Sequence, residues 1–118
     1  MKQRVFIPQK QDRYDVTPVK FYSPDLIYVI DKKYANPFDI DGLIELIRHR
    51  LIVEHFDPEK DFICLTGSPI LLSLFLATIV RVYPLNDQYK ILMFDAKMNK
   101  YRLRILNFFN VIGGVPMK

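Results

Sequence analysis

The stretch from Phe62 to Val80, FICLTGSPILLSLFLATIV, contains no charged residue and constrains the fold more than any other part of the chain. Its first five residues are apolar and partly β-branched, which is typical of a buried strand. Gly67 interrupts the run. Ser68 is then a favourable helix N-cap and Pro69 a favourable first helical residue, because the N–H that proline lacks has no helical partner there. A strand, a glycine turn and a helix predict an α/β sheet.

Similar patterns predict the other elements of one domain of 118 residues. Leu26–Ile30 is apolar throughout and is predicted as a strand covered on both faces. Apolar side chains at helical spacing from Ile40 to Leu51 predict one helix, and Pro69 to about Val82 predicts a second. Tyr89–Phe94 and Lys100–Leu106 predict a β-hairpin. We therefore expect a small Rossmann-like α/β sandwich, with a mostly parallel sheet of four or five strands, two helices and a C-terminal hairpin.

The order of the three predicted parallel strands stays open at this point. If they are numbered along the chain from Leu26–Ile30, the orders 2-1-3 and 1-2-3 both obey the connection rules. A membrane span is not expected, because Pro69 to Val80 alone is too short to cross a bilayer.

The two ends of the chain differ from its middle. Residues 1–24 contain three prolines and predict an extended arm, in which Val5–Ile7 adds at most a short edge strand. Residues 107–118 predict an apolar tail with a flexible Gly113-Gly114 pair. Residues 1–20 carry five basic and two acidic side chains, residues 90–118 carry six and one, and residues 21–89 carry six and ten. Basic ends favour a polyanionic partner or acidic surfaces of neighbouring copies.

A candidate phosphate site follows from the ends of the predicted strands. Parallel strands present their carboxyl ends at one rim of the sheet, where ligands bind. The residues expected there are Asp31, Thr66, Gly67, Ser68 and Asp95. The hydroxyls and the helix start suit a phosphate, and the carboxylates suit an accompanying Mg²⁺. The alternative is that these residues serve local structure alone: Ser68 caps the helix, Asp31 ends a strand and Asp95 begins the hairpin turn. One glycine is fewer than phosphate-binding loops usually contain.

The predicted hairpin carries a basic row. Lys100, Arg102 and Arg104 face one way along the second strand, with Lys97 in the preceding turn, and Tyr101 faces the other way. Such a row suits the phosphates of DNA or RNA. The alternative is an edge strand that its charges protect from aggregation.

No catalytic, metal or cofactor site is predicted. His49 and His55 are the only histidines, and their spacing does not place both on one helical face. Cys64 is the only cysteine, which excludes an internal disulfide and favours a small buried core residue in a reducing compartment.

Five short pieces of the chain carry a resemblance to a loose group of small, uncharacterised proteins of tailed bacteriophages. They are Tyr14–Pro18, Leu26–Ile30, Asp57–Phe62, Leu65–Pro69 and Ile91–Asp95 followed by Tyr101. This chain has Ser68 where the group has an aspartate and Phe94 where it has a tryptophan. The resemblance implies a phage origin and an α/β fold, but no activity and no functional residues.

We therefore expect a non-enzymatic phage accessory or assembly protein in the host cytoplasm or the virion. The second predicted helix has Arg81 as its only charge, so its surplus apolar face is expected to meet another copy or another phage protein. The alternatives are a nucleic-acid-binding protein that uses the basic row and a nucleotide- or phosphate-binding module at Thr66–Ser68.

Overall fold

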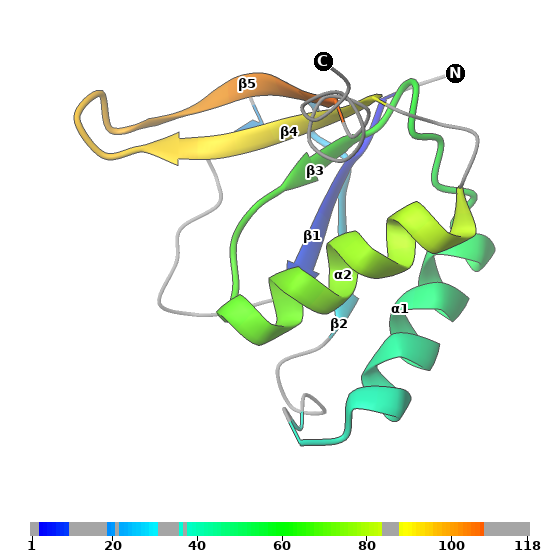
Figure 1. The fold of residues 1–118 in the computed structure, drawn as a ribbon. Coiled ribbons are helices and arrows are strands. Elements are labelled where there is room, and N and C mark those ends of the chain that lie inside the picture. The colour runs from blue at the N-terminus through cyan, green and yellow to red at the C-terminus, as the bar shows by residue number, and fades with distance from the viewer. Residues whose placement is uncertain are drawn as a thin grey trace, which may run out of the picture.

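The fold is a mixed α/β arrangement of one five-stranded sheet and two helices (Figure 1). The computed structural model describes residues 3–9, 19–20, 22–30, 36, 38–83 and 88–107. The elements are β1 (Val5–Gln9), β2 (Leu26–Ile30), α1 (Ile40–Val53), β3 (Phe62–Cys64), α2 (Pro69–Val82), β4 (Gln88–Asp95) and β5 (Lys100–Asn107). The strand order is β2-β1-β3-β4-β5, with the first four strands parallel and β5 antiparallel to β4. The mostly parallel sheet, the two helices and the C-terminal hairpin are therefore confirmed.

The prediction that Val5–Ile7 forms at most an edge strand is wrong. β1 lies between β2 and β3, and all five of its residues are buried. The prolines around this segment hid the strand, because a proline within a run argues against a central position. The structure accommodates Pro8 because β1 pairs with β3 only through Val5 and Phe6. The missing N–H of Pro8 therefore falls beyond the end of that ladder.

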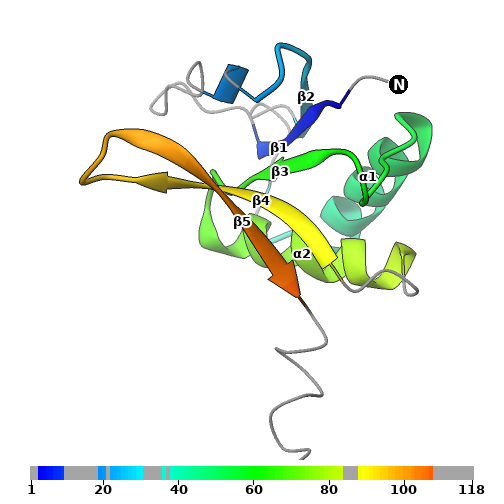
Figure 2. The ribbon, with the colours of Figure 1, turned by 90° about the horizontal axis from the view of Figure 1, so that it is seen from above.

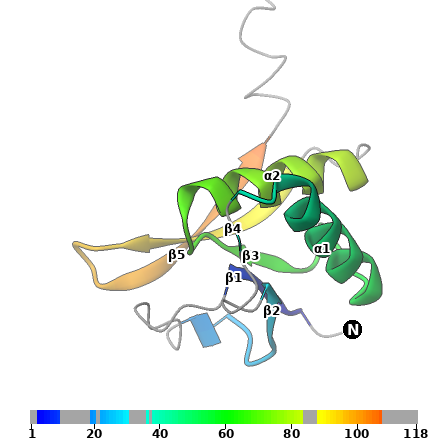
Figure 3. The ribbon, with the colours of Figure 1, turned by 90° about the horizontal axis from the view of Figure 1, so that it is seen from below.

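Both helices cover the same face of the sheet (Figures 2 and 3). The chain moves in one direction across the sheet from β2 through α1 to β3, and again from β3 through α2 to β4. Two right-handed crossovers in the same direction place their helices on the same face. The main core lies in this layer, between Phe6, Ile63 and Ile91 of the sheet and the buried side chains Leu43, Ile47, Leu51, Leu71, Phe75 and Ile79 of the helices.

The opposite face of the sheet has a smaller core and a shorter cover. The step from β1 to β2 runs in the other direction, and a right-handed crossover in that direction lies over this face. Val19 and Tyr22 from that connection pack on a cluster that includes Phe62 and Cys64. The Tyr22 hydroxyl also donates to the carbonyl of Tyr101 at 3.1 Å. Large side chains of β4 and β5 beyond this cover therefore remain exposed.

Local signals fix the ends of both helices. Asp39 caps α1 and accepts from the N–H of Gly42 at 3.0 Å. Ser68 caps α2 and accepts from the N–H of Leu71 at 3.3 Å, and Pro69 is the first helical residue, as predicted. Serine and aspartate fit because their short side chains satisfy first-turn amides that have no helical partner.

Candidate binding surfaces

The sheet has a topological switch point between β1 and β3, where ligands of parallel α/β sheets usually bind. The chain leaves β1 toward β2 and leaves β3 in the opposite direction, toward β4. Gln9 ends β1 and is buried, and Gly67 follows β3 with a φ of 133°. A Cβ on Gly67 would lie 3.7 Å from the Cβ of Gln9, so the two residues are neighbours. Gln9 was missed from sequence because β1 was not recognised as a central strand.

The structure brings together only part of the predicted phosphate site. Thr66, Gly67 and Ser68 follow one another at the switch point, whereas Asp31 lies outside the described residues. Asp95 does not join them. Cys64 at the end of β3 pairs with Leu92, and β4 continues from there into the hairpin up to Asp95. Asp95 therefore lies past the rim where it was expected, because β4 extends beyond its last pair with β3.

Most first-turn donors of α2 are already used. Pro69 has no N–H, Leu71 donates to the Ser68 side chain, and Leu72 donates to the Ser68 carbonyl at 2.9 Å. Of the first-turn amides, this leaves the N–H of Ile70. The Thr66 residue is buried, and its N–H donates to the carbonyl of Cys64. The role of Ser68 as a helix cap is therefore sufficient to explain its position. Phosphate binding stays a hypothesis, in which one first-turn N–H of α2 could donate to the phosphate.

The hairpin of β4 and β5 presents the predicted basic row. Lys97, Lys100, Arg102 and Arg104 are all exposed. Within β5 the alternation is as predicted, since Lys100, Arg102 and Arg104 lie opposite Asp95, Met93 and Ile91 on one face.

Asp95 occupies the tip of this row and neutralises part of it. Its carboxylate accepts from Arg102 Nη1 at 3.0 Å and from the N–H groups of Lys97 and Met98. The bond from Arg102 is the largest cause of a lowered pKa at Asp95, followed by the Met98 bond. Asp95 thus begins the turn, as the structural alternative proposed, and binds a neighbouring arginine in addition.

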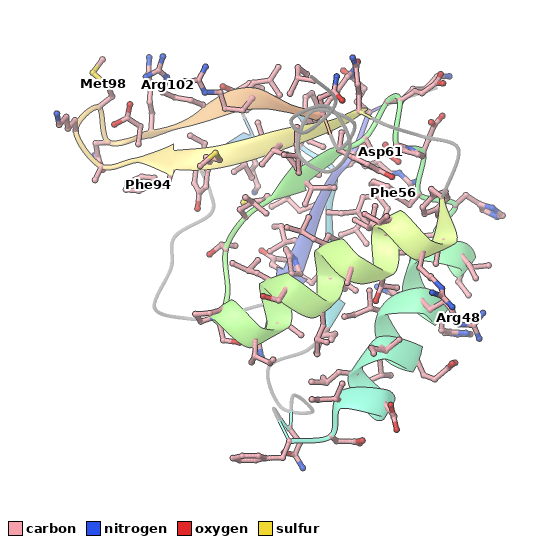
Figure 4. All side chains as sticks on the ribbon, in the orientation of Figure 1. Arg48, Phe56, Asp61, Phe94, Met98 and Arg102 are labelled. Carbon is pink, nitrogen blue, oxygen red and sulfur yellow. The ribbon has the colours of Figure 1, made fainter. Side chains whose placement is uncertain are left out.

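The other face of the hairpin is apolar and open. Phe94, Leu103 and Ile105 share it with Tyr101, and their exposed fractions are 50%, 40% and 53%. Tyr101 is buried and packs edge-on against Phe94, with 5.4 Å between ring centroids. Figure 4 shows Phe94 and Arg102 on opposite sides of the ribbon. The sequence predicted this alternation but not the exposure of these side chains, because the residues that cover part of that face, Val19 and Tyr22, lie far away in the chain.

The predicted surplus apolar face of α2 is narrow in the structure. The exposed positions of α2 are Pro69, Ile70, Ser73, Ala77 and Arg81. Ile70 is the one large apolar side chain among them. The other large exposed apolar residues of the described chain lie on the hairpin, at Phe38 just before α1, and on α1 itself, where they are Ile40, Leu46, Ile52 and Val53.

No three His, Cys, Asp or Glu side chains among the described residues are placed to hold a metal ion. Cys64 is buried, which raises the pKa of its thiol to about 12 and keeps it protonated. The buried Asp61 carboxylate is bonded to Arg4 and to the N–H of Asp57. No helix in the described part of the chain is long and apolar enough to span a membrane.

One comparison with known proteins gave a match. The model of a family described as phage Pam3 gp32-like protein matches residues 3–107 of this chain. Comparisons with the curated proteins and with the solved structures gave no significant match. The matched range begins two residues before β1 and ends with β5, so it contains all five strands and both helices.

Proposed function

The chain belongs to the phage Pam3 gp32-like protein family, and from this premise we propose that it is a non-enzymatic accessory or assembly protein that acts by contacting other proteins. The partners in this proposal are further copies of the chain or other phage proteins, in the host cytoplasm or in the virion. The β2-β1-β3-β4 order supports a Rossmann-like description of the sheet as part of the same proposal.

The open apolar face of the hairpin carries this proposal. Leu103 and Ile105 are successive residues on this face, Phe94 lies opposite Tyr101 nearer the tip, and Met98 at the tip is also exposed. Burying one such side chain fully is worth about 1.5–3 kcal/mol, and exposed apolar patches of this kind mark interaction sites. The hairpin replaces α2 as the proposed contact surface, because α2 exposes only Ile70 among its large apolar side chains.

Sedimentation velocity from low to high micromolar concentration, combined with pairwise binding to the purified proteins of the same phage, tests the proposal. We expect the wild type to self-associate or to bind a phage protein, and Phe94→Ser with Ile105→Ser to weaken that contact. Leu46→Ser is the matched control, because it removes an equally exposed apolar side chain from α1. A strict monomer that binds none of the phage proteins would contradict the proposal.

A second candidate is nucleic-acid binding by the basic row, favoured by the exposure of Lys97, Lys100 and Arg104. Contacts would be to phosphates, since Tyr101 is buried and Phe94 faces the other side. Three phosphate contacts predict that log K falls with log salt at a slope of about −3. Alanine at the three basic positions without loss of DNA or RNA affinity would remove this candidate.

A further inference from the structure

The outer edge of β5 carries backbone groups that point away from β4, and the hydrogen-bond ladder of the hairpin identifies them. Leu65 donates its N–H to the carbonyl of Leu92, so the backbone groups of Leu92 point toward β3 and away from β5. Leu92 lies opposite Leu103, which makes this a non-hydrogen-bonded pair of the hairpin. The N–H and carbonyl of Leu103 therefore point away from β4, and by the same alternation so do those of Tyr101 and Ile105.

One end of this edge is already occupied. The Tyr101 carbonyl accepts from the Tyr22 hydroxyl, so the open part of the edge runs from Leu103 to Ile105. Within the described sheet β5 has β4 as its one neighbour. A strand added here would hydrogen-bond to Leu103 and Ile105 without disturbing the bonds of Arg102 and Arg104 to β4.

The charges of β5 oppose pairing with a second copy of itself. Two identical strands related by a twofold axis run antiparallel, and opposite residues then share a face. Lys100, Arg102 and Arg104 all share one face, so the in-face registers centred on residues 100 to 104 place basic side chains opposite one another. Like charges directly opposite are destabilising, so pairing with a second β5 is unfavourable in these registers.

We propose that the β5 edge binds an extended strand of another phage protein in which acidic and apolar side chains alternate, an inference that rests on the proposed function. The acidic side chains lie opposite Arg102 and Arg104, and the apolar ones extend the surface of Leu103 and Ile105. Arg102 and Arg104 occupy the non-hydrogen-bonded positions of an added antiparallel strand, where opposite side chains come closest. Backbone bonds supply affinity, and the alternation supplies specificity.

Arg104 makes the larger contribution to this recognition. Arg102 already binds the Asp95 carboxylate at 3.0 Å, whereas the described residues give Arg104 no ion pair. Reversing the charge at position 104 is therefore the sharper change, because it breaks no bond within the hairpin.

The test uses labelled peptides as long as the eight residues of β5, with fluorescence anisotropy as the readout. The probes are an alternating Glu-Val peptide, an alternating Lys-Val peptide, and a peptide with the same Glu and Val content grouped in two blocks. We expect only the alternating acidic peptide to bind the wild-type protein. Arg104→Glu should weaken it by about tenfold and reduce the preference for it over the Lys-Val peptide. Arg48→Glu makes the same charge change on α1, far from the hairpin (Figure 4), and should leave binding unchanged.

Leu103→Pro tests the backbone contact. It removes an N–H that points outward, which an edge strand tolerates, and should reduce affinity for the Glu-Val peptide by about tenfold or more. An alternating peptide with N-methylated backbone amides should fail to bind the wild type, and it gives the same information should Leu103→Pro not fold.

Three results would overturn the inference: no binding of the alternating acidic peptide, equal binding of the alternating and block peptides, or preferential binding of single-stranded DNA or RNA that Leu103→Pro leaves intact. The proposed function is judged separately. A phage protein that binds Leu103→Pro as tightly as wild type would preserve that function and remove the β5 edge from it.

Discussion

His55 ends α1 in a backbone conformation that glycine usually adopts. Its φ is 55°, and its N–H and that of Phe56 donate to the carbonyls of Ile52 and Leu51. This pair of backbone hydrogen bonds is the Schellman motif. Its left-handed position favours glycine, because a Cβ is unfavourable there. The backbone therefore supplies a helix stop that the sequence signals only weakly.

Replacing His55 by glycine should stabilise the protein. The Cβ of a left-handed residue costs about 1–2 kcal/mol, part of which glycine returns through its greater freedom in the unfolded chain. We expect His55→Gly to raise the free energy of unfolding by about 1 kcal/mol, measured by urea unfolding. His55→Ala is the control, because it removes the imidazole but keeps the Cβ. An equal gain for alanine would show that backbone strain is not the cause.

The Cys64 thiol links stability to alkaline pH. Burial raises its pKa from 9.0 to about 12, an effect that a hydrogen bond with Tyr101 partly offsets. The thiol ionises in the unfolded chain at a lower pH than in the folded one. The contribution of the buried thiol to the free energy of unfolding is therefore complete below about pH 9. It is lost, at about 1.4 kcal/mol per pH unit, as the pH rises toward about 12.

The stability difference between wild type and Cys64→Ala should consequently shift toward the variant by about 1.4 kcal/mol between about pH 8 and about pH 10. Denaturant unfolding at the two pH values measures it, and the variant corrects for other groups that titrate in this range. A difference that does not change with pH would contradict the prediction.

At the scale of elements, how well the sequence predicted a segment depended on where its signal lies. The cap of α2, the helical spacing of α1 and the alternation of β5 are local signals, and these elements appear as predicted. β1 was missed because what makes it central is its pairing with β2 and β3, while its own sequence shows a proline and a polar end. The short extent of β3 was missed for the same reason, and Asp95 was misplaced with it.

Asp95 should hold the hairpin turn in a pH-dependent way. Its pKa is lowered chiefly by the bond from Arg102, so its stabilising effect is present above the pKa of the unfolded carboxyl and is lost as the pH falls through the folded value. We expect Asp95→Asn to speed amide hydrogen exchange at the hairpin tip at neutral pH. The difference from wild type should disappear in acid. Equal exchange at neutral pH would show that the turn does not depend on the carboxylate.

At the scale of the whole molecule, the sequence could predict which residue types make up a candidate surface but not which surfaces stay exposed or lie next to each other. The basic row was identified residue by residue, since alternation along one strand is visible in the sequence. The open apolar face depends on how far Val19 and Tyr22 reach across the sheet, and the neighbourhood of Gln9 and Gly67 depends on strand order. Both are relations between segments far apart in the chain, which local patterns do not encode.

The amino end of the sheet is held together by one buried carboxylate. Asp61 is 2% exposed and accepts from the Arg4 N–H at 3.1 Å, from Arg4 Nη2 at 3.2 Å and from the Asp57 N–H at 2.8 Å. The same guanidinium donates to the carbonyl of His55 at 3.0 Å and lies over the Phe6 ring. Asp61 therefore joins the start of β1, the end of α1 and the start of β3.

Removing Asp61 should destabilise the whole fold and not one loop. Breaking a buried ion pair typically costs 3–5 kcal/mol, and because the Arg4 side chain is 24% exposed we expect about 3 kcal/mol for Asp61→Ala. Asp61→Asn retains one acceptor oxygen and should lose less. Glu54→Ala is the matched control: its carboxylate lies 3.7 Å from the same guanidinium but is a quarter exposed, so its loss should stay within about 1 kcal/mol. Urea unfolding followed by circular dichroism measures all three. Equal losses for Asp61→Ala and Glu54→Ala would mean that burial adds nothing to this contact, and that the amino end of the sheet is held by its apolar core alone.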